Sequence, residues 1–168
     1  MIKKISLGLL ALIVLIQFVP VEKNESNDTE FDMTKSYNVP DNVSMILKGA
    51  CNDCHTNLTR YPWYSNIQPV KYLLADHVNE GKEHLNFSSF TKLPIAVQNH
   101  KFEEVIEMVE TKEMPLESYT YFGLHPEANL TDLERKALME WAQEQMAMLA
   151  ATYPPDSLVM KRRTPPAP

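Results

Sequence analysis

Apolar residues recur at helical spacing through the central part of the chain, residues 41–152, with almost no strand-like alternation. In the stretch Phe102–Val109, apolar side chains occupy positions i, i+3, i+4 and i+7 of one helix face. Similar apolar stripes precede Cys51, follow Pro69 and follow Thr131. The pattern therefore predicts an all-α domain of about four helices.

Several residues mark where these helices are expected to begin and end. Pro69 and Pro94 suit the first position of a helix, where a missing N–H removes no hydrogen bond. Gly81 is expected to end the helix that Pro69 begins. Thr131 followed by Glu134 matches a capping box, in which each residue bonds the backbone N–H of the other. The last helix therefore has the best-defined start.

The first 21 residues combine a short basic start, Met1–Lys4, with an uncharged apolar run, Ile5–Val21. A helix over that run would be ~25 Å long, close to the ~30 Å hydrocarbon core of a bilayer. No small-residue cleavage site follows, which favours a retained membrane anchor over a cleaved secretion signal. Lys3 and Lys4 stay inside, so the rest is expected on the periplasmic side of the inner membrane. A cleaved signal with a soluble periplasmic product is the alternative.

The rest of the chain divides by composition into three parts. Residues 22–40 are polar and acidic without an apolar period, which predicts a flexible linker to the first 21 residues. Residues 41–152 form the expected folded domain. Residues 153–168 contain five of the twelve prolines and are expected to be a loose tail.

Charge narrows the range of partners. The chain has 16 basic and 22 acidic side chains, a formal net charge of −6. Such a chain repels phosphate backbones, which disfavours nucleic-acid binding, and it suits a basic redox partner protein. Four glycines are too few for a nucleotide-binding protein built on glycine-rich loops.

The sequence Cys51-Asn52-Asp53-Cys54-His55 indicates the chemistry. A C-x-x-C pair alone fits a redox dithiol, a disulfide, half a zinc site or haem attachment. The flanks are helical, unlike those of a redox dithiol, and no further pair with zinc-ligand spacing is present. A disulfide across two intervening residues would stabilise little. His55 directly after the pair favours haem c, with a dithiol or another metal site as the alternatives.

The spacing of the motif matches covalent haem attachment. Each thiol adds to one vinyl group of haem, and one helical turn separates the two sulfurs by the distance between the vinyls. His55 then lies beneath the iron and binds it through a ring nitrogen. The predicted cofactor is one haem c, covalently bound through Cys51 and Cys54, with His55 as an iron ligand. Attachment of this kind is completed outside the cytoplasm, in agreement with the predicted export.

The order of these parts resembles the class I c-type cytochromes, and more specifically a small bacterial family of haem-binding domain proteins. The resemblance covers residues 41–151 and rests on Cys51–His55, Tyr61–Tyr64, Ile67, Pro69–Val70, His77–Val78, Gly81, Leu85–Ser88, Met114–Pro115, Tyr119, His125 and Leu130–Thr131. It implies a cytochrome c-like helical bundle around one haem, and no particular reaction. The few glycines and the long run between the haem motif and Met114 depart from the broader cytochrome pattern.

The second axial ligand of the iron is predicted to be Met114. It precedes a proline in the loop between the third and fourth helices, where cytochromes carry their axial methionine, and the proline stiffens that loop. His125 and His77 are the alternatives, although a lone histidine is more often a hydrogen-bonding residue of the core. His84 and His100 are expected to be solvated.

Aromatic residues after the motif are candidates to line the haem. These are Trp63, Tyr64, Tyr61 and Phe87. An aromatic cluster in a helical protein usually belongs to the core, and the haem would be part of that core. The carbonyl of Pro62 or Pro69 is expected to accept a hydrogen bond from the second ring nitrogen of His55.

Three functions are compatible with these predictions. The first is one-electron transfer by a six-coordinate haem, which makes the protein a carrier rather than an enzyme. The second is catalysis or peroxide or gas sensing at a five-coordinate iron, which requires a distal acid or base such as His77 or His125. The third is a role as an accessory haem subunit of a larger complex. Electron transfer is favoured.

Overall fold

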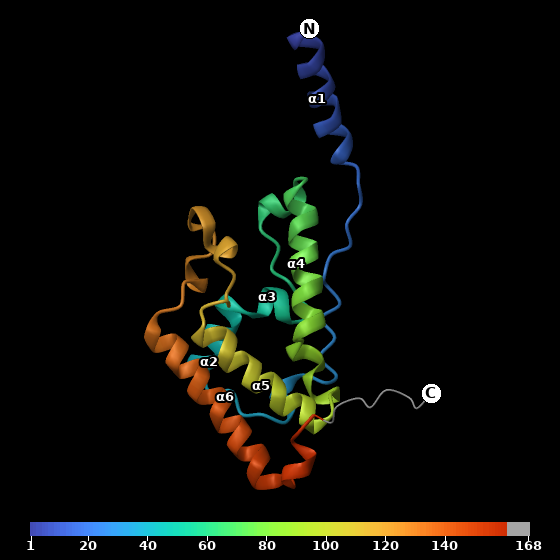
Figure 1. Ribbon diagram of the computed structural model, residues 1–168. Coiled ribbons are helices and arrows are strands. Elements are labelled where there is room, and N and C mark those ends of the chain that lie inside the picture. Colours follow the sequence, from blue (N-terminus) through green and yellow to red (C-terminus); the bar gives the residue numbers. More distant parts are fainter. Residues whose placement is uncertain (161–168) are drawn as a thin grey trace, which may run out of the picture.

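The computed structural model describes residues 1–160, which form helices joined by loops without any strand (Figure 1). The predicted all-α class is confirmed, and the four expected helices are α2, α4, α5 and α6. The α-helices are α1 (Ile2–Ile16), α2 (Asp41–Ala50), α3 (Asn52–His55), α4 (Val70–His84), α5 (Ile95–Glu110) and α6 (Asp132–Thr152). The short 3-10 helices are η1 (Met33–Lys35), η2 (Trp63–Asn66), η3 (Phe87–Lys92), η4 (Glu117–Gly123), η5 (Pro126–Ala128) and η6 (Pro155–Ser157).

The hydrophobic core is centred on α5 and α6, which pack side by side (Figure 1). The ring of Phe102 on α5 meets that of Trp141 on α6 edge to face, with centroids 5.6 Å apart. Leu138 of α6 and Val43 of α2 are also fully buried. Each such side chain contributes about 1.5–3 kcal/mol through burial. Cys51, at the end of α2, packs on this core, so the first residue of the motif sits on a rigid frame.

Of three helix ends marked by sequence signals, one agrees with the structure and two differ from it. The predicted capping box is confirmed: Glu134 N–H donates to Thr131 Oγ1 at 3.2 Å, and Thr131 N–H donates to Glu134 Oε2 at 2.8 Å. Pro69 lies just before α4 rather than at its first position. The prediction that Gly81 ends this helix is wrong, since α4 continues to His84. Gly81 is needed for close packing rather than for a helix end.

Residues 22–40 are packed against the domain and do not form the flexible linker that their composition predicts (Figure 1). Met33 and Tyr37 are buried in the core, and Tyr37 Oη donates to the side-chain oxygen of Gln98. Asn24 N–H donates to Tyr61 Oη at 2.7 Å. Isolated apolar residues in a polar stretch show no helical or strand-like periodicity, yet each can fill a separate gap in the fold. The periodicity of the sequence therefore does not predict their burial.

The apolar N-terminus forms α1, which projects away from the rest of the fold (Figure 1). Its fifteen residues begin and end earlier than the predicted run Ile5–Val21, and none of them is buried. Just after α1, Gln17 Oε1 accepts the backbone N–H of Gln68 at 2.9 Å. Across residues 1–160, no helix is both long and apolar enough to span a membrane.

The chain after α6 turns back onto the core. Leu158 packs partly against the core, and its carbonyl accepts a hydrogen bond from Asn99 Nδ2 at 3.4 Å. This contact holds the beginning of the predicted loose tail, which contains η6. The remainder of that tail, residues 161–168, lies outside the described residues.

Candidate functional site

The Cys51–His55 motif lies at the junction of two helices. Cys51 ends α2 and caps α3, and its carbonyl accepts the N–H groups of Cys54 at 3.2 Å and His55 at 3.0 Å. These bonds close one helical turn, as the spacing predicts, so that the same turn carries both thiols and the imidazole. The two cysteines are partly buried and form no disulfide.

The imidazole of His55 is oriented by two backbone carbonyls. Its Nδ1 lies 2.9 Å from the oxygens of Gly81 and Leu85, so Nδ1 carries the proton and donates it to them. The predicted partners Pro62 and Pro69 are wrong, because the end of α4 rather than its start packs on the motif. Burial lowers the pKa of His55, although the two carbonyls act in the opposite direction. The ring is therefore neutral, with the Nε2 lone pair available to a metal.

Both cysteines are protonated thiols at neutral pH. Burial, with a smaller effect of Cys54, raises the pKa of Cys51 to about 12. Burial and the carboxylate of Asp53 raise the pKa of Cys54 to about 11. A reactive dithiol needs lowered thiol pKa values, so these values disfavour that alternative. A metal site of three or more His, Cys, Asp or Glu side chains is also absent from the described part of the chain.

Gly81 allows α4 to pack directly on the motif. A Cβ atom at this position would lie 2.8 Å from the carbonyl oxygen of Cys54 and 3.1 Å from its Cβ. The first distance is shorter than van der Waals contact allows, and the oxygen belongs to the backbone. Any side chain at residue 81 would therefore separate α4 from the turn that carries Cys54 and His55.

Replacing Gly81 with alanine is expected to destabilise the protein by about 1–3 kcal/mol, which is the usual cost of overpacking. The sign of the change in unfolding free energy distinguishes the two effects, because replacing glycine with alanine inside a helix ordinarily stabilises a protein by up to about 1 kcal/mol. Denaturant unfolding of Gly81→Ala measures the change. Gly49→Ala in α2 is the control: there a Cβ would meet the flexible Glu127 side chain at 3.3 Å. Equal or greater stability of both variants would show that the contact with Cys54 is unimportant.

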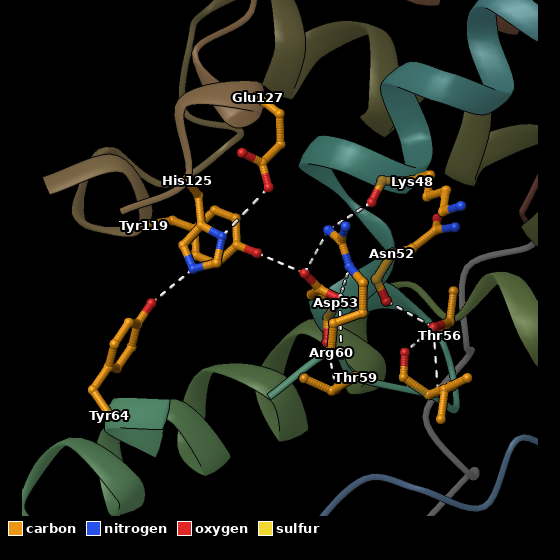
Figure 2. A network of polar contacts seen from close by, with 11 residues as sticks. Lys48, Asn52, Asp53, Thr56, Thr59, Arg60, Tyr64, Tyr119, His125 and Glu127 are labelled. Carbon is orange, nitrogen blue, oxygen red and sulfur yellow. Dashed lines mark hydrogen bonds and ion pairs between the residues drawn. The ribbon is translucent and has the colours of Figure 1, made fainter. Parts of the chain in front are cut away.

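Asp53, between the two cysteines, is the centre of a polar network (Figure 2). Its carboxylate accepts the Nε and Nη2 groups of Arg60 at 3.0 and 2.8 Å and the hydroxyl of Tyr119 at 2.7 Å. Burial opposes ionisation, but the hydrogen bonds from Arg60 and Tyr119 outweigh it and lower the pKa of Asp53. Arg60 also donates to the carbonyl of Lys48, which joins α2 to the network.

The network continues from Tyr119 to His125 and Tyr64 (Figure 2). The rings of Tyr119 and His125 are stacked, with centroids 4.0 Å apart and planes within 7°. His125 Nε2 is 2.7 Å from the hydroxyl of Tyr64, and Nδ1 lies 3.6 Å from a carboxylate oxygen of Glu127. Nε2 is thus hydrogen-bonded within the protein, while Nδ1 faces the carboxylate of Glu127 beyond hydrogen-bond distance. Sequence reasoning missed the connection of Asp53 to Tyr119, since the middle positions of C-x-x-C-H carry no spacing signal.

The predicted aromatic lining is only partly assembled near the motif. Phe87 is buried, with its ring centroid 6.1 Å from that of His55. Tyr64 contacts His125, whereas Trp63 is 76% exposed and contacts Tyr64 edge to face. Tyr61 bonds the backbone of residue 24 instead.

Met114 lies partly buried in the loop after α5. Its N–H donates to the carbonyl of Met108 at 3.0 Å, and its own carbonyl accepts a bond from Arg135 Nη1 at 2.9 Å. The backbone of Met114 is thus held from both α5 and α6. His77 is partly buried on α4. The choice of the second axial ligand stays a prediction.

The two other histidines occupy solvated positions, as expected. His84 is exposed near the end of α4. His100 on α5 forms contacts at 3.2 Å with Glu103 and Glu104 on the same helix. Neither arrangement suggests an iron ligand.

Apolar side chains remain exposed on both segments that reach the motif. On α4 they include Val70 and Leu73, and in the 116–124 loop they include Leu116 and Leu124. A small cavity of about 10 Å³ separates Cys54 from the ring of His125. These exposed apolar side chains lie on the helix and the loop that contact the motif through Gly81 and Tyr119.

Comparison with known proteins agrees with the geometry. A model of the family described as "Haem-binding domain" matches residues 11–144, which is more than half of the chain. No curated protein and no solved structure matches. The matched range includes the motif, both ring partners of His55 and Met114. The chain belongs to the haem-binding domain family.

Proposed function

We propose that this protein carries one haem, bound covalently through Cys51 and Cys54, and that it transfers single electrons. The observation that carries the proposal is the orientation of His55. Its Nδ1 is hydrogen-bonded to the carbonyls of Gly81 and Leu85, which leaves Nε2 as the ligand atom on the same turn as two protonated thiols.

The residues present fit such a group. Haem c needs two thiols and a neutral imidazole on one helical turn, and α3 with its cap supplies this set. When bound, haem supplies an iron that alternates between the ferric and ferrous states. The chain's own contribution is to fix the imidazole and to cover the ring with apolar side chains. Trp63 and Tyr64 on η2 are proposed to contribute to this cover.

Met114 is proposed to be the second axial ligand. A thioether raises the reduction potential of haem relative to a second imidazole. A loop that is held at Met114 by Met108 and Arg135 would limit the movement of the sulfur. A fully ligated iron changes little in geometry between oxidation states, which suits an electron carrier.

The hydrogen bond between His125 and Tyr64 supports electron transfer over catalysis. A five-coordinate haem enzyme needs a distal acid or base with a free ring nitrogen. Here one nitrogen of His125 bonds Tyr64, and the other faces Glu127. The excess of 22 acidic over 16 basic side chains further supports a basic redox partner protein.

Absorption spectra of purified protein in both oxidation states test this function. Covalent haem would stay with the chain on a denaturing gel and resist acidic acetone. Low-spin spectra with a near-infrared methionine–iron band, and only slow binding of carbon monoxide, are expected for a carrier. A high-spin iron that binds carbon monoxide would instead indicate the catalytic or sensing function.

We further propose that the N-terminal segment directs export to the periplasm. Deleting Met1–Val19 is then expected to leave the protein in the cytoplasm without covalent haem. The deletion spares Asn24, Met33 and Tyr37, so the contacts of residues 22–40 are retained. Fractionation and haem staining provide the measurement.

The control for this deletion restores export by other means. The same truncated chain behind an unrelated cleavable secretion signal should regain covalent haem. Haem attached to the truncated chain in the cytoplasm would contradict the prediction. The N-terminus of the purified full-length protein distinguishes a cleaved signal from a retained segment.

A further inference from the structure

In the loop that connects α5 to α6, the second half packs on α2 through η5, whereas the first half is held near the haem motif by few contacts. Its segment η4, Glu117–Gly123, contains no buried residue. Phe122 in this segment is 97% exposed, and Tyr121 is 48% exposed. Burial of apolar surface therefore contributes little to the position of η4, and its polar contacts decide where it lies.

Among residues 1–160, one side-chain hydrogen bond joins η4 to another helix. This bond runs from Tyr119 Oη to Asp53 Oδ2, at 2.7 Å (Figure 2). Burial and the bond to Asp53 raise the pKa of Tyr119 well above its usual range, so its hydroxyl stays a donor. Because the acceptor is an ionised and buried carboxylate, the bond belongs to the strong, charge-assisted class.

Asp53 is itself rigidly placed. Its side chain is only 9% exposed and is held by the two guanidinium bonds of Arg60. Arg60 in turn bonds the carbonyl of Lys48, and the backbone carbonyl of Asp53 accepts the hydroxyl of Thr59. The carboxylate is therefore a fixed point of α3, between the two cysteines.

The stacked ring of Tyr119 extends this hold to the second half of the loop. His125 lies flat against Tyr119 and is bonded to Tyr64 of η2. Figure 2 shows Asp53 of α3, the stacked rings of Tyr119 and His125 in the loop, and Tyr64 of η2 in a row. The loop is thus tied to the elements on both sides of Cys54.

We propose that Asp53 and Tyr119 form a latch that positions the Met114 loop over the haem motif. This inference rests on the proposed function, in which Met114 binds the iron. The backbone of Met114 is held by Met108 of α5 and Arg135 of α6, and Tyr119 holds the path of the loop five residues later. Asp53 and Tyr119 are positioning residues: they fix the path of the loop and leave the ligand itself to Met114.

The test compares Tyr119→Phe with Tyr121→Phe in the purified holoprotein. Tyr119→Phe removes the hydroxyl, keeps the ring, and leaves Asp53 paired with Arg60, so folding is preserved. Tyr121 is a matched control on the same segment, since its hydroxyl makes no hydrogen bond within the described residues. The readouts are the rate of carbon monoxide binding to ferrous haem and the amide hydrogen exchange of residues 116–124.

Loss of a hydrogen bond to a charged group should raise the fraction of molecules in which the loop is detached from the motif by roughly tenfold or more. We therefore expect Tyr119→Phe to speed both carbon monoxide binding and loop exchange by about tenfold or more. Tyr121→Phe should change neither. Asp53→Asn, which keeps a neutral acceptor, should fall between wild type and Tyr119→Phe.

The two readouts separate the latch from the ligand. Suppose that Tyr119→Phe speeds loop exchange but not carbon monoxide binding. The latch would then hold the loop, and its proposed effect on Met114 would be wrong. Unchanged loop exchange in Tyr119→Phe would overturn the latch, whatever the iron ligand is. A wild-type iron that is already high-spin and binds carbon monoxide rapidly would instead refute the Met114 ligation of the proposed function, while loop exchange still tests the latch.

Discussion

Replacing both Cys51 and Cys54 with alanine is expected to abolish covalent haem attachment. No sulfur then remains to form a thioether, so the denatured chain should lose all haem staining. Each single alanine variant should retain at most one thioether and a correspondingly altered spectrum. Haem staining of denaturing gels and the mass of the intact protein measure these changes.

The double variant is expected to keep its helical core. The buried side chains that join α5 to α6, including Phe102, Leu138 and Trp141, lie on helices that carry neither cysteine. Circular dichroism should therefore show most of the helix content retained. Haem that still resists acidic acetone in the double variant would contradict thioether attachment at this motif.

Met114→Ala is expected to leave the second axial position of the iron vacant. The site would become partly high-spin, lose the near-infrared methionine band and bind carbon monoxide or cyanide readily. Met114→His should stay low-spin with a lower reduction potential, a shift on the order of 0.1 V within the ~0.8 V range that axial ligands can set. Optical spectra and a potentiometric titration provide the measurement.

Met108→Leu is the matched control for Met114→Ala. Met108 lies on α5, so its replacement should leave the spectrum unchanged. His125→Ala should also leave the iron six-coordinate, because Nε2 of His125 is hydrogen-bonded to Tyr64. If Met114→Ala changes nothing and His125→Ala or His77→Ala opens the iron, the second ligand is a histidine.

Local sequence signals determined the helical parts of the fold. The capping box at Thr131 and Glu134, the stripe Phe102–Val109 and the turn of Cys51–His55 each depend on neighbours within four residues. Side chains at such spacing meet on one helix whatever surrounds them. The haem motif belongs to this class, because its three chemical groups lie on a single turn.

The surroundings of that turn were decided by tertiary structure alone. The carbonyls that orient His55 come from residues 26 and 30 positions later, and the hydroxyl that bonds Asp53 comes from 66 positions later. Gly81 has the sequence signature of a helix end, but its position against Cys54 made it a packing residue inside α4.

The position of the polar stretch 22–40 also depends on tertiary contacts that the sequence pattern does not reveal. Its composition predicts a free chain, whereas Met33 and Tyr37 are buried in gaps formed by distant helices. Periodicity detects a face that one helix presents repeatedly, and it misses single side chains that fill separate gaps. The sequence by itself thus determined the helices and the haem-binding turn. Only tertiary contacts decided what holds the imidazole, the Asp53 carboxylate and the Met114 loop in place, because these contacts join residues far apart along the chain.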